Sequence, residues 1–203
     1  MKNLSLPLLC LVVLSLSACQ TSSLTQDEKV SAPETSTPFS GVLKGIDMTQ
    51  SHISFVGKSN IVNHEGKFTT YSAHVTLDSA EPSNLEKATI DATIDVASVK
   101  TDADGLNGHL QKEDFFDAEQ FPTVSFVSTN ILSKKDANQY EVTGNLTIKG
   151  TTKVVTFDAE ITDDYLVATY DLPRLDFGIG NESYGNKFLE PTVPVNVKMV
   201  FLK

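Results

Sequence analysis

The chain has 203 residues and a formal net charge of −10, with 40% hydrophobic residues, 8% aromatic residues and no tryptophan. The acidic excess, without any run of lysine or arginine, argues against nucleic acid as a partner and against electrostatic docking on anionic lipid. Once an N-terminal segment is set apart, the remaining length suits one domain with a substantial core.

The N-terminus is typical of an export signal. Residues 4–17 form an apolar run that is too short to span a bilayer as a helix. Leu16-Ser17-Ala18-Cys19 follows and resembles a bacterial lipobox, in which small residues precede a cysteine. We therefore predict a lipoprotein signal peptide over residues 1–18, cleavage before Cys19, and acylation of the Cys19 thiol and its new amine. An ordinary secretory signal with a chance cysteine is the alternative.

Residues 19–40 are predicted to form a flexible tether that joins the lipidated Cys19 to a folded domain over residues 41–203. The tether is rich in serine and threonine and holds too few large apolar side chains to fold. Two or more acyl chains attach a protein stably to a bilayer. We expect an exported protein that is lipid-anchored to the cell envelope. The residue after Cys19 is Gln20 and not an aspartate. In Gram-negative lipoproteins this resembles an outer-membrane address, which implies the periplasmic face of the outer membrane if the host is Gram-negative.

Alternation of apolar and polar residues predicts an all-β domain. Eight antiparallel strands, most of them linked as hairpins, are expected near residues 52–59, 66–78, 88–96, 123–132, 142–148, 155–161, 165–172 and 195–201. Residues typical of turns separate several of them. A sandwich and a barrel both fit this pattern, and the pattern alone does not choose between them.

Residues 108–126 concentrate four phenylalanines in a chain that has few aromatic residues. Pro122 ends any helix and begins a strand that shows Val124 and Phe126 on one face. We expect one short helical segment near residues 104–116, with Phe115, Phe116 and Phe121 closing one end of an apolar interior.

The sequence gives no sign of an enzyme, a metal site or a cofactor site. None of the four histidines pairs with another at the spacing of metal ligands. His109 is expected to brace the helical segment, and Asp102 or Asp104 to cap its N-terminus. Arg174 and Asp176 share one strand face in the predicted pattern, which suggests a structural ion pair or a contact at the barrel mouth. No catalytic residues are predicted.

Four blocks in order resemble the YceI-like family, over roughly residues 46–202. They are DMTQSHISF from Asp47, HL…DFFDA…FPT…F from His109, GNLTIKGTTKVVTF from Gly144, and LPRLDFG from Leu172. The chain departs from the family where Leu106-Asn107 replaces a common Arg-Asp pair, and where Gln50 replaces a histidine before Ser51.

The resemblance implies an eight-stranded antiparallel lipocalin-like barrel with an apolar interior. It implies a long apolar ligand, such as a polyisoprenoid, an isoprenoid quinone or a fatty amide, held for carriage, storage or sensing. A homodimer and a monomer both stay open. The predicted ligand-binding residues are Ile90, Ala92, Ile94, Phe115, Phe116, Phe121, Val124, Phe126, Leu146, Ile148, Phe157 and Ile161.

Four small residues on the inward faces, Ala88, Ala92, Gly144 and Ala159, are expected to leave room for that ligand. The main alternative is a solid-cored envelope interaction or scaffold module without a small-molecule ligand. An enzyme acting on quinones or lipids is a weaker reading, because the predicted lining contains no acid–base pair.

Overall fold

A computed structural model describes residues 41–180 and 189–203. The predicted signal peptide, Cys19 and the tether lie outside the described residues. Within the described part, no helix is both long and apolar enough to cross a membrane.

The described residues form eleven strands and one α-helix, joined by turns and three short 3-10 helices. The strands are β1 (Gly41–Lys44), β2 (His52–Gly57), β3 (His64–Phe68), β4 (Tyr71–Asp78), β5 (Thr89–Asp95), β6 (Val99–Thr101), β7 (Thr123–Ser133), β8 (Gln139–Ile148), β9 (Thr151–Ile161), β10 (Tyr165–Pro173) and β11 (Thr192–Val200). The helices are η1 (Leu85–Lys87), η2 (Val96–Ser98), α1 (Asp104–Leu110) and η3 (Arg174–Phe177).

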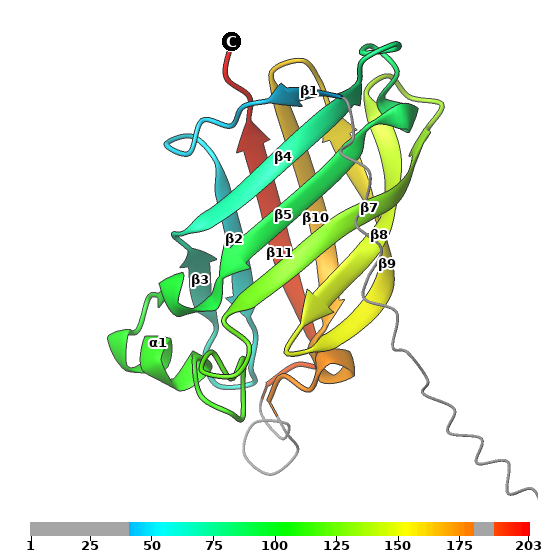
Figure 1. The fold of residues 1–203 in the computed structure, drawn as a ribbon. Coiled ribbons are helices and arrows are strands. Elements are labelled where there is room, and N and C mark those ends of the chain that lie inside the picture. The colour runs from blue at the N-terminus through cyan, green and yellow to red at the C-terminus, as the bar shows by residue number, and fades with distance from the viewer. Residues whose placement is uncertain (1–40, 181–188) are drawn as a thin grey trace, which may run out of the picture. The chain divides into compact units, whose positions relative to one another are not determined.

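All strands belong to one antiparallel sheet that curls into a barrel (Figure 1). The strand order is β1-β4-β5-β7-β8-β9-β10-β11-β2-β3-β6. The chain that follows β1 crosses from the β4 edge to the end of β11, where Ile46 pairs with Phe201 and the Asp47 amide donates to the Val200 carbonyl at 2.8 Å. Ser51 adds to this join, because its Oγ accepts from the Val200 amide at 2.9 Å.

The predicted all-β barrel is confirmed, but the predicted number of strands is wrong. One predicted strand, residues 66–78, is two, because the chain changes partner at Thr69-Thr70: β3 pairs with β2, whereas β4 pairs with β5. Ser98 holds this corner, because its carbonyl accepts hydrogen bonds from the Thr69 amide at 3.3 Å and from the Thr69 hydroxyl at 3.0 Å. The short strands β1 and β6 were also not expected.

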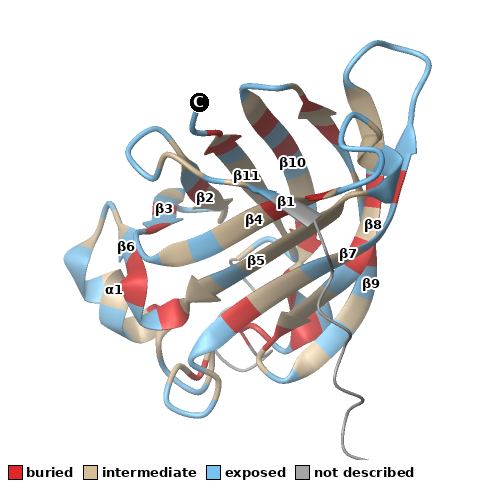
Figure 2. Ribbon diagram, turned by 45° about the horizontal axis from the view of Figure 1, so that its top comes forward, coloured by how far each residue is buried: buried red, intermediate tan, exposed pale blue. Residues whose placement is uncertain are grey.

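Inward and outward residues alternate along the strands (Figure 2), as a curled sheet with one apolar face requires. One end of the barrel, where β9 ends and β10 begins, is packed solid. Five buried side chains fill it: Leu77, Ile131, Val142, Ile161 and Phe201. The α1 segment lies at the other end (Figure 1).

The helix is shorter than predicted and has a different cap. It ends at Leu110, so Phe115 and Phe116 lie beyond it in a series of turns. Its N-cap is Ala103, without a side-chain cap, which contradicts the expected Asp102 or Asp104. Asn107 secures the start of the helix instead, because its Oδ1 accepts from the Thr101 amide at 2.6 Å and from the Thr101 hydroxyl at 2.9 Å.

Candidate functional site: an apolar cavity inside the barrel

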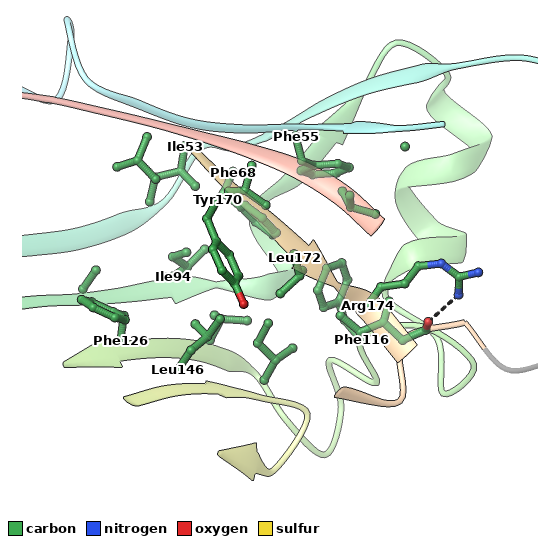
Figure 3. Close-up of a pocket in the computed structure, with 18 of the residues that line it drawn as sticks. Ile53, Phe55, Phe68, Ile94, Phe116, Phe126, Leu146, Tyr170, Leu172 and Arg174 are labelled. Carbon is green, nitrogen blue, oxygen red and sulfur yellow. Dashed lines mark hydrogen bonds between the residues drawn. The ribbon is translucent and has the colours of Figure 1, made fainter. Parts of the chain in front are cut away.

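The barrel is hollow over part of its length. A cavity of about 410 Å³ runs from the middle of the strands to the α1 end. That volume lies within the range of sites that bind small molecules, roughly 300–1,000 Å³. Its wall is made mainly of aliphatic and aromatic side chains from strands on all sides (Figure 3).

Ten of the twelve residues predicted to bind a ligand lie in this wall. They are Ile90, Ala92, Ile94, Phe115, Phe116, Val124, Phe126, Leu146, Ile148 and Phe157. Phe121 and Ile161 do not line the cavity. Whether the ten contact a ligand stays a prediction.

Ile161 points inward as predicted but is only 2% exposed, inside the solid end of the barrel. A period of two identifies the inward face of a strand but not how far along the barrel the hollow extends. Phe121 packs on the turn between β8 and β9 instead. A Cβ built on Gly150 would lie 2.7 Å from its ring, and Gly150 has a φ of +72°, so a glycine is required there.

Of the four small residues expected to leave room, only Ala92 opens on the cavity. Gly144 makes room for a protein side chain, because a Cβ there would lie 2.5 Å from the Phe126 ring. Ala159 is 2% exposed in the packed core, and Ala88 packs against that core. The expectation is therefore correct at one position and wrong at three.

Two rows of aromatic rings form opposite parts of the wall. Phe68 contacts Phe55 and Phe116, with ring centroids 5.8 and 5.9 Å apart. On the other side, Phe157 lies between Phe126 and Tyr170, at 5.5 and 6.1 Å. Such spacings are those of favourable aromatic pairs.

Sequence reasoning missed Phe55, Phe68 and Tyr170 as wall residues. Tyr170 had a usable signal, because it continues the inward series Leu166 and Ala168 on β10 at a period of two. Phe68 had none, because it is the last residue before the Thr69-Thr70 corner, where the strand pattern restarts.

The α1 end of the cavity is bounded by Leu106, His109 and Leu110. His109 braces this end, since its ring lies 4.9 Å from that of Phe115 and its Nε2 lies 3.5 Å from Asp114 Oδ2. Nearby, Asp102 Oδ1 accepts a hydrogen bond from His64 Nδ1 at 2.8 Å, and this hydrogen bond lowers the pKa of the Asp102 carboxyl.

Arg174 holds the chain together at the same end and does not share a strand face with Asp176, because η3 replaces the expected strand. The side chain is 1% exposed. Its guanidinium donates to the carbonyls of Ile179, Gly180 and Leu189 at 2.8–2.9 Å, and to that of Glu190 at 2.8 Å. Burial lowers its pKa. Asp176 lies 3.5 Å from Lys153 instead.

Across the described ranges, no group of three or more His, Cys, Asp or Glu side chains is arranged to hold a metal ion. The wall does contain histidines, and each of them pairs with a carboxylate. The pairs are His64 with Asp102, His74 with Asp91, and His109 with Asp114. What the arrangement offers a guest molecule is an apolar surface with few polar groups.

An antiparallel barrel of this topology with an apolar cavity defines a lipocalin-like fold. The chain belongs to the family of the YceI-like domain, whose model matches residues 45–201. The family predicted from the four sequence blocks is thus confirmed.

Among curated relatives, a UPF0312 protein of Photorhabdus laumondii is 34% identical over 96 residues, and Protein YceI of Salmonella arizonae is 34% identical over 96 residues. The match covers 47% of this chain in both cases, and 47% and 48% of the relatives. The chain thus spans about half the length of the curated relatives it matches.

Solved structures are similar over more of the chain. BcnA of Burkholderia cenocepacia has a TM-score of 0.69 and 29% identity, covering 76% of this chain and 98% of that one. The YCEI protein of Campylobacter jejuni has a TM-score of 0.59 and 29% identity, covering 68% and 84%. A polyisoprenoid binding domain from Saccharophagus degradans has a TM-score of 0.59 at 16% identity, covering 79% and 98%, and so shares the fold.

Proposed function

We propose that this protein is a membrane-anchored binding protein that holds one long apolar ligand in its barrel and has no catalytic activity. The observation that carries the proposal is the cavity of about 410 Å³ with its almost wholly apolar wall. A solid-cored scaffold module, the alternative from the sequence, does not account for that hollow.

Desolvation would supply the affinity. Each CH₂ group moved from water into an apolar environment gains about 0.8 kcal/mol. A chain of several isoprene units could therefore bind tightly without a strong polar contact. Because the rings within each aromatic row already pack against one another, the wall is largely formed before the ligand enters, which limits the entropy lost on binding.

The ligand class that fits best is a polyisoprenoid or an isoprenoid quinone. The almost wholly apolar interior suits an unbranched or methyl-branched hydrocarbon chain. The fold shared with a polyisoprenoid binding domain from Saccharophagus degradans supports the same class. Carriage, storage and sensing are all compatible with such a site.

The test is organic extraction of a form comprising residues 21–203, produced in a bacterial envelope, followed by mass spectrometry. We expect an apolar molecule at about one per protein chain. An extract that holds no such molecule, from protein that also fails to take one up from lipid vesicles, would contradict the proposal.

The anchor is tested separately. We propose that Cys19 carries the acyl chains, on the strength of Leu16-Ser17-Ala18-Cys19. Cys19→Ser should move the protein from the membrane fraction to the soluble fraction and abolish incorporation of labelled palmitate. Cys10→Ser is the matched control, because Cys10 lies inside the predicted signal peptide and should change neither result. A Cys19→Ser variant that stays in membranes and still takes up palmitate would contradict the anchor.

A further inference from the structure

The inner surface of β10 presents one polar atom to the cavity. Tyr170 lies in the wall, with its ring 6.1 Å from that of Phe157. Figure 3 shows its hydroxyl pointing in among the apolar lining residues, whereas the guanidinium of Arg174 lies at one end.

The other polar side chains of the wall already have partners. Their contacts are Ser59 Oγ to the Val62 carbonyl at 2.5 Å, His64 to Asp102 at 2.8 Å, His74 to Asp91 at 2.9 Å, His109 to Asp114 at 3.5 Å, and Arg174 to four carbonyls. The Tyr170 hydroxyl makes no hydrogen bond with any residue that the structure describes. Of the two side-chain hydroxyls in the wall, Ser59 and Tyr170, it is the one left to donate to a guest.

A phenol hydroxyl in an apolar enclosure gains most from a partner that fits its position. Left without one, it forfeits the hydrogen bond that it would make in water. Burial raises the pKa of the Tyr170 phenol, with a smaller contribution from the charge of Asp176. The group is thus held in its neutral form, in which it can donate.

The wall favours a neutral acceptor over an anionic one. Asp114, which pairs with His109 at the α1 end, would repel an anion there. Apart from the histidines, Arg174 is the one cationic side chain of the wall in the described ranges, and its donors face backbone carbonyls. A phosphate or carboxylate beside Tyr170 would lose its hydration without gaining a cationic partner, which is unfavourable.

We propose that Tyr170 is the specificity-determining residue of this site, and that its hydroxyl donates a hydrogen bond to a neutral oxygen acceptor, such as a quinone, ketone, ester or amide carbonyl, carried by the long apolar ligand. This rests on the proposed function. It adds that the site prefers a chain with such an oxygen to a pure hydrocarbon of the same length.

The test compares octadecane with 2-octadecanone, which have equal chain lengths and differ by one carbonyl oxygen. The full chain, purified in detergent, is offered both together, and the retained amounts are measured by gas chromatography with mass spectrometry. Tyr170→Phe should lower the ratio of ketone to hydrocarbon about threefold to tenfold relative to the wild type. Partition into micelles affects both variants equally and cancels.

Tyr140→Phe is the matched control. Tyr140 lies on β8 and packs against the core but does not line the cavity, so removing its hydroxyl should leave the ratio unchanged. A second measurement needs no variant. The carbonyl stretching band of 2-octadecanone bound to the wild type should lie at lower wavenumber than in a hydrocarbon solvent, because a donated hydrogen bond weakens the C=O bond.

The outcomes separate the two proposals. If both compounds are retained but Tyr170→Phe keeps the wild-type ratio, or the carbonyl band is unshifted, the role of Tyr170 is overturned and the apolar site stands. If the wild type retains neither compound, both proposals fall.

Discussion

Tyr71 is the residue whose polar atom has the least favourable surroundings in the described chain. Its hydroxyl is buried without a hydrogen-bond partner, and burial raises its pKa. Because a buried unpaired hydroxyl is destabilising by roughly 1 kcal/mol or more, Tyr71→Phe should raise the free energy of unfolding by about 1 kcal/mol. Urea denaturation followed by circular dichroism measures the change. A variant less stable than the wild type would show that the hydroxyl has a partner, such as a bound water.

Single residues also show where sequence reasoning stops. Phe126 and Gly144 were both expected to shape the interior, and their strands were predicted correctly. That the glycine accommodates the Phe126 ring follows from the register Phe126–Leu146, next to Ser128–Gly144, between β7 and β8. A pattern of period two gives the facing side of each strand but not this register, and so not which small residue leaves space for a ligand.

At the scale of an element, β5 lets the hollow be tested. Ala92 opens on the cavity, whereas its neighbour Thr93 is exposed on the outer face. Ala92→Phe would place a ring in the space for the ligand, so it should reduce ligand content more than stability. The measurements are ligand content by extraction and the midpoint of urea unfolding. Thr93→Phe adds the same ring outside and should leave ligand content unchanged.

The contrasting variant is Ala159→Phe. Ala159 was expected to behave like Ala92, but it lies in the packed core on β9. Overpacking there should lower the free energy of unfolding by about 1–3 kcal/mol. If Ala92→Phe unfolds the protein as severely as Ala159→Phe while the folded fraction keeps its ligand, the hollow at Ala92 is contradicted.

Elements with strong alternation were predicted well and those without it were missed. β5, β7 and β10 fall within one residue of their predicted ranges because their inward faces are continuous, whereas β8, β9 and β11 begin three or four residues before theirs. β6 is only three residues long and follows η2, so it carries no periodic signal. The Thr69-Thr70 corner depends on hydrogen bonds to Ser98, which is distant in sequence and so gives no local sign.

For the whole molecule, acid should weaken the fold. Hydrogen bonds from the Ser133 hydroxyl and amide lower the pKa of Glu86, which joins η1 to the end of β7. A carboxyl whose pKa falls on folding stabilises the protein at pH values above its unfolded pKa, which is about 4. That contribution is lost as the pH falls through the folded pKa. The stability of the wild type should therefore drop in this range.

Glu86→Gln tests the origin of that drop. The variant should be less stable than the wild type near neutral pH, and the difference should shrink as the pH falls below about 4. Glu119→Gln removes an exposed carboxylate that accepts no hydrogen bond in the described part of the chain, and is the control. The measurement is the urea midpoint of each variant at pH values from neutral to below about 4. A difference for Glu86→Gln that stays constant with pH would contradict the assignment.

Native mass spectrometry of the protein, released gently from detergent, tests the central claim most directly, because it counts guest molecules per chain. We predict a mass above that of the polypeptide by one apolar molecule, which is lost on collisional activation, and a bare chain that regains this mass after exposure to envelope lipids. A folded protein that carries no added mass and takes up no lipid would contradict the claim that the barrel binds an apolar molecule.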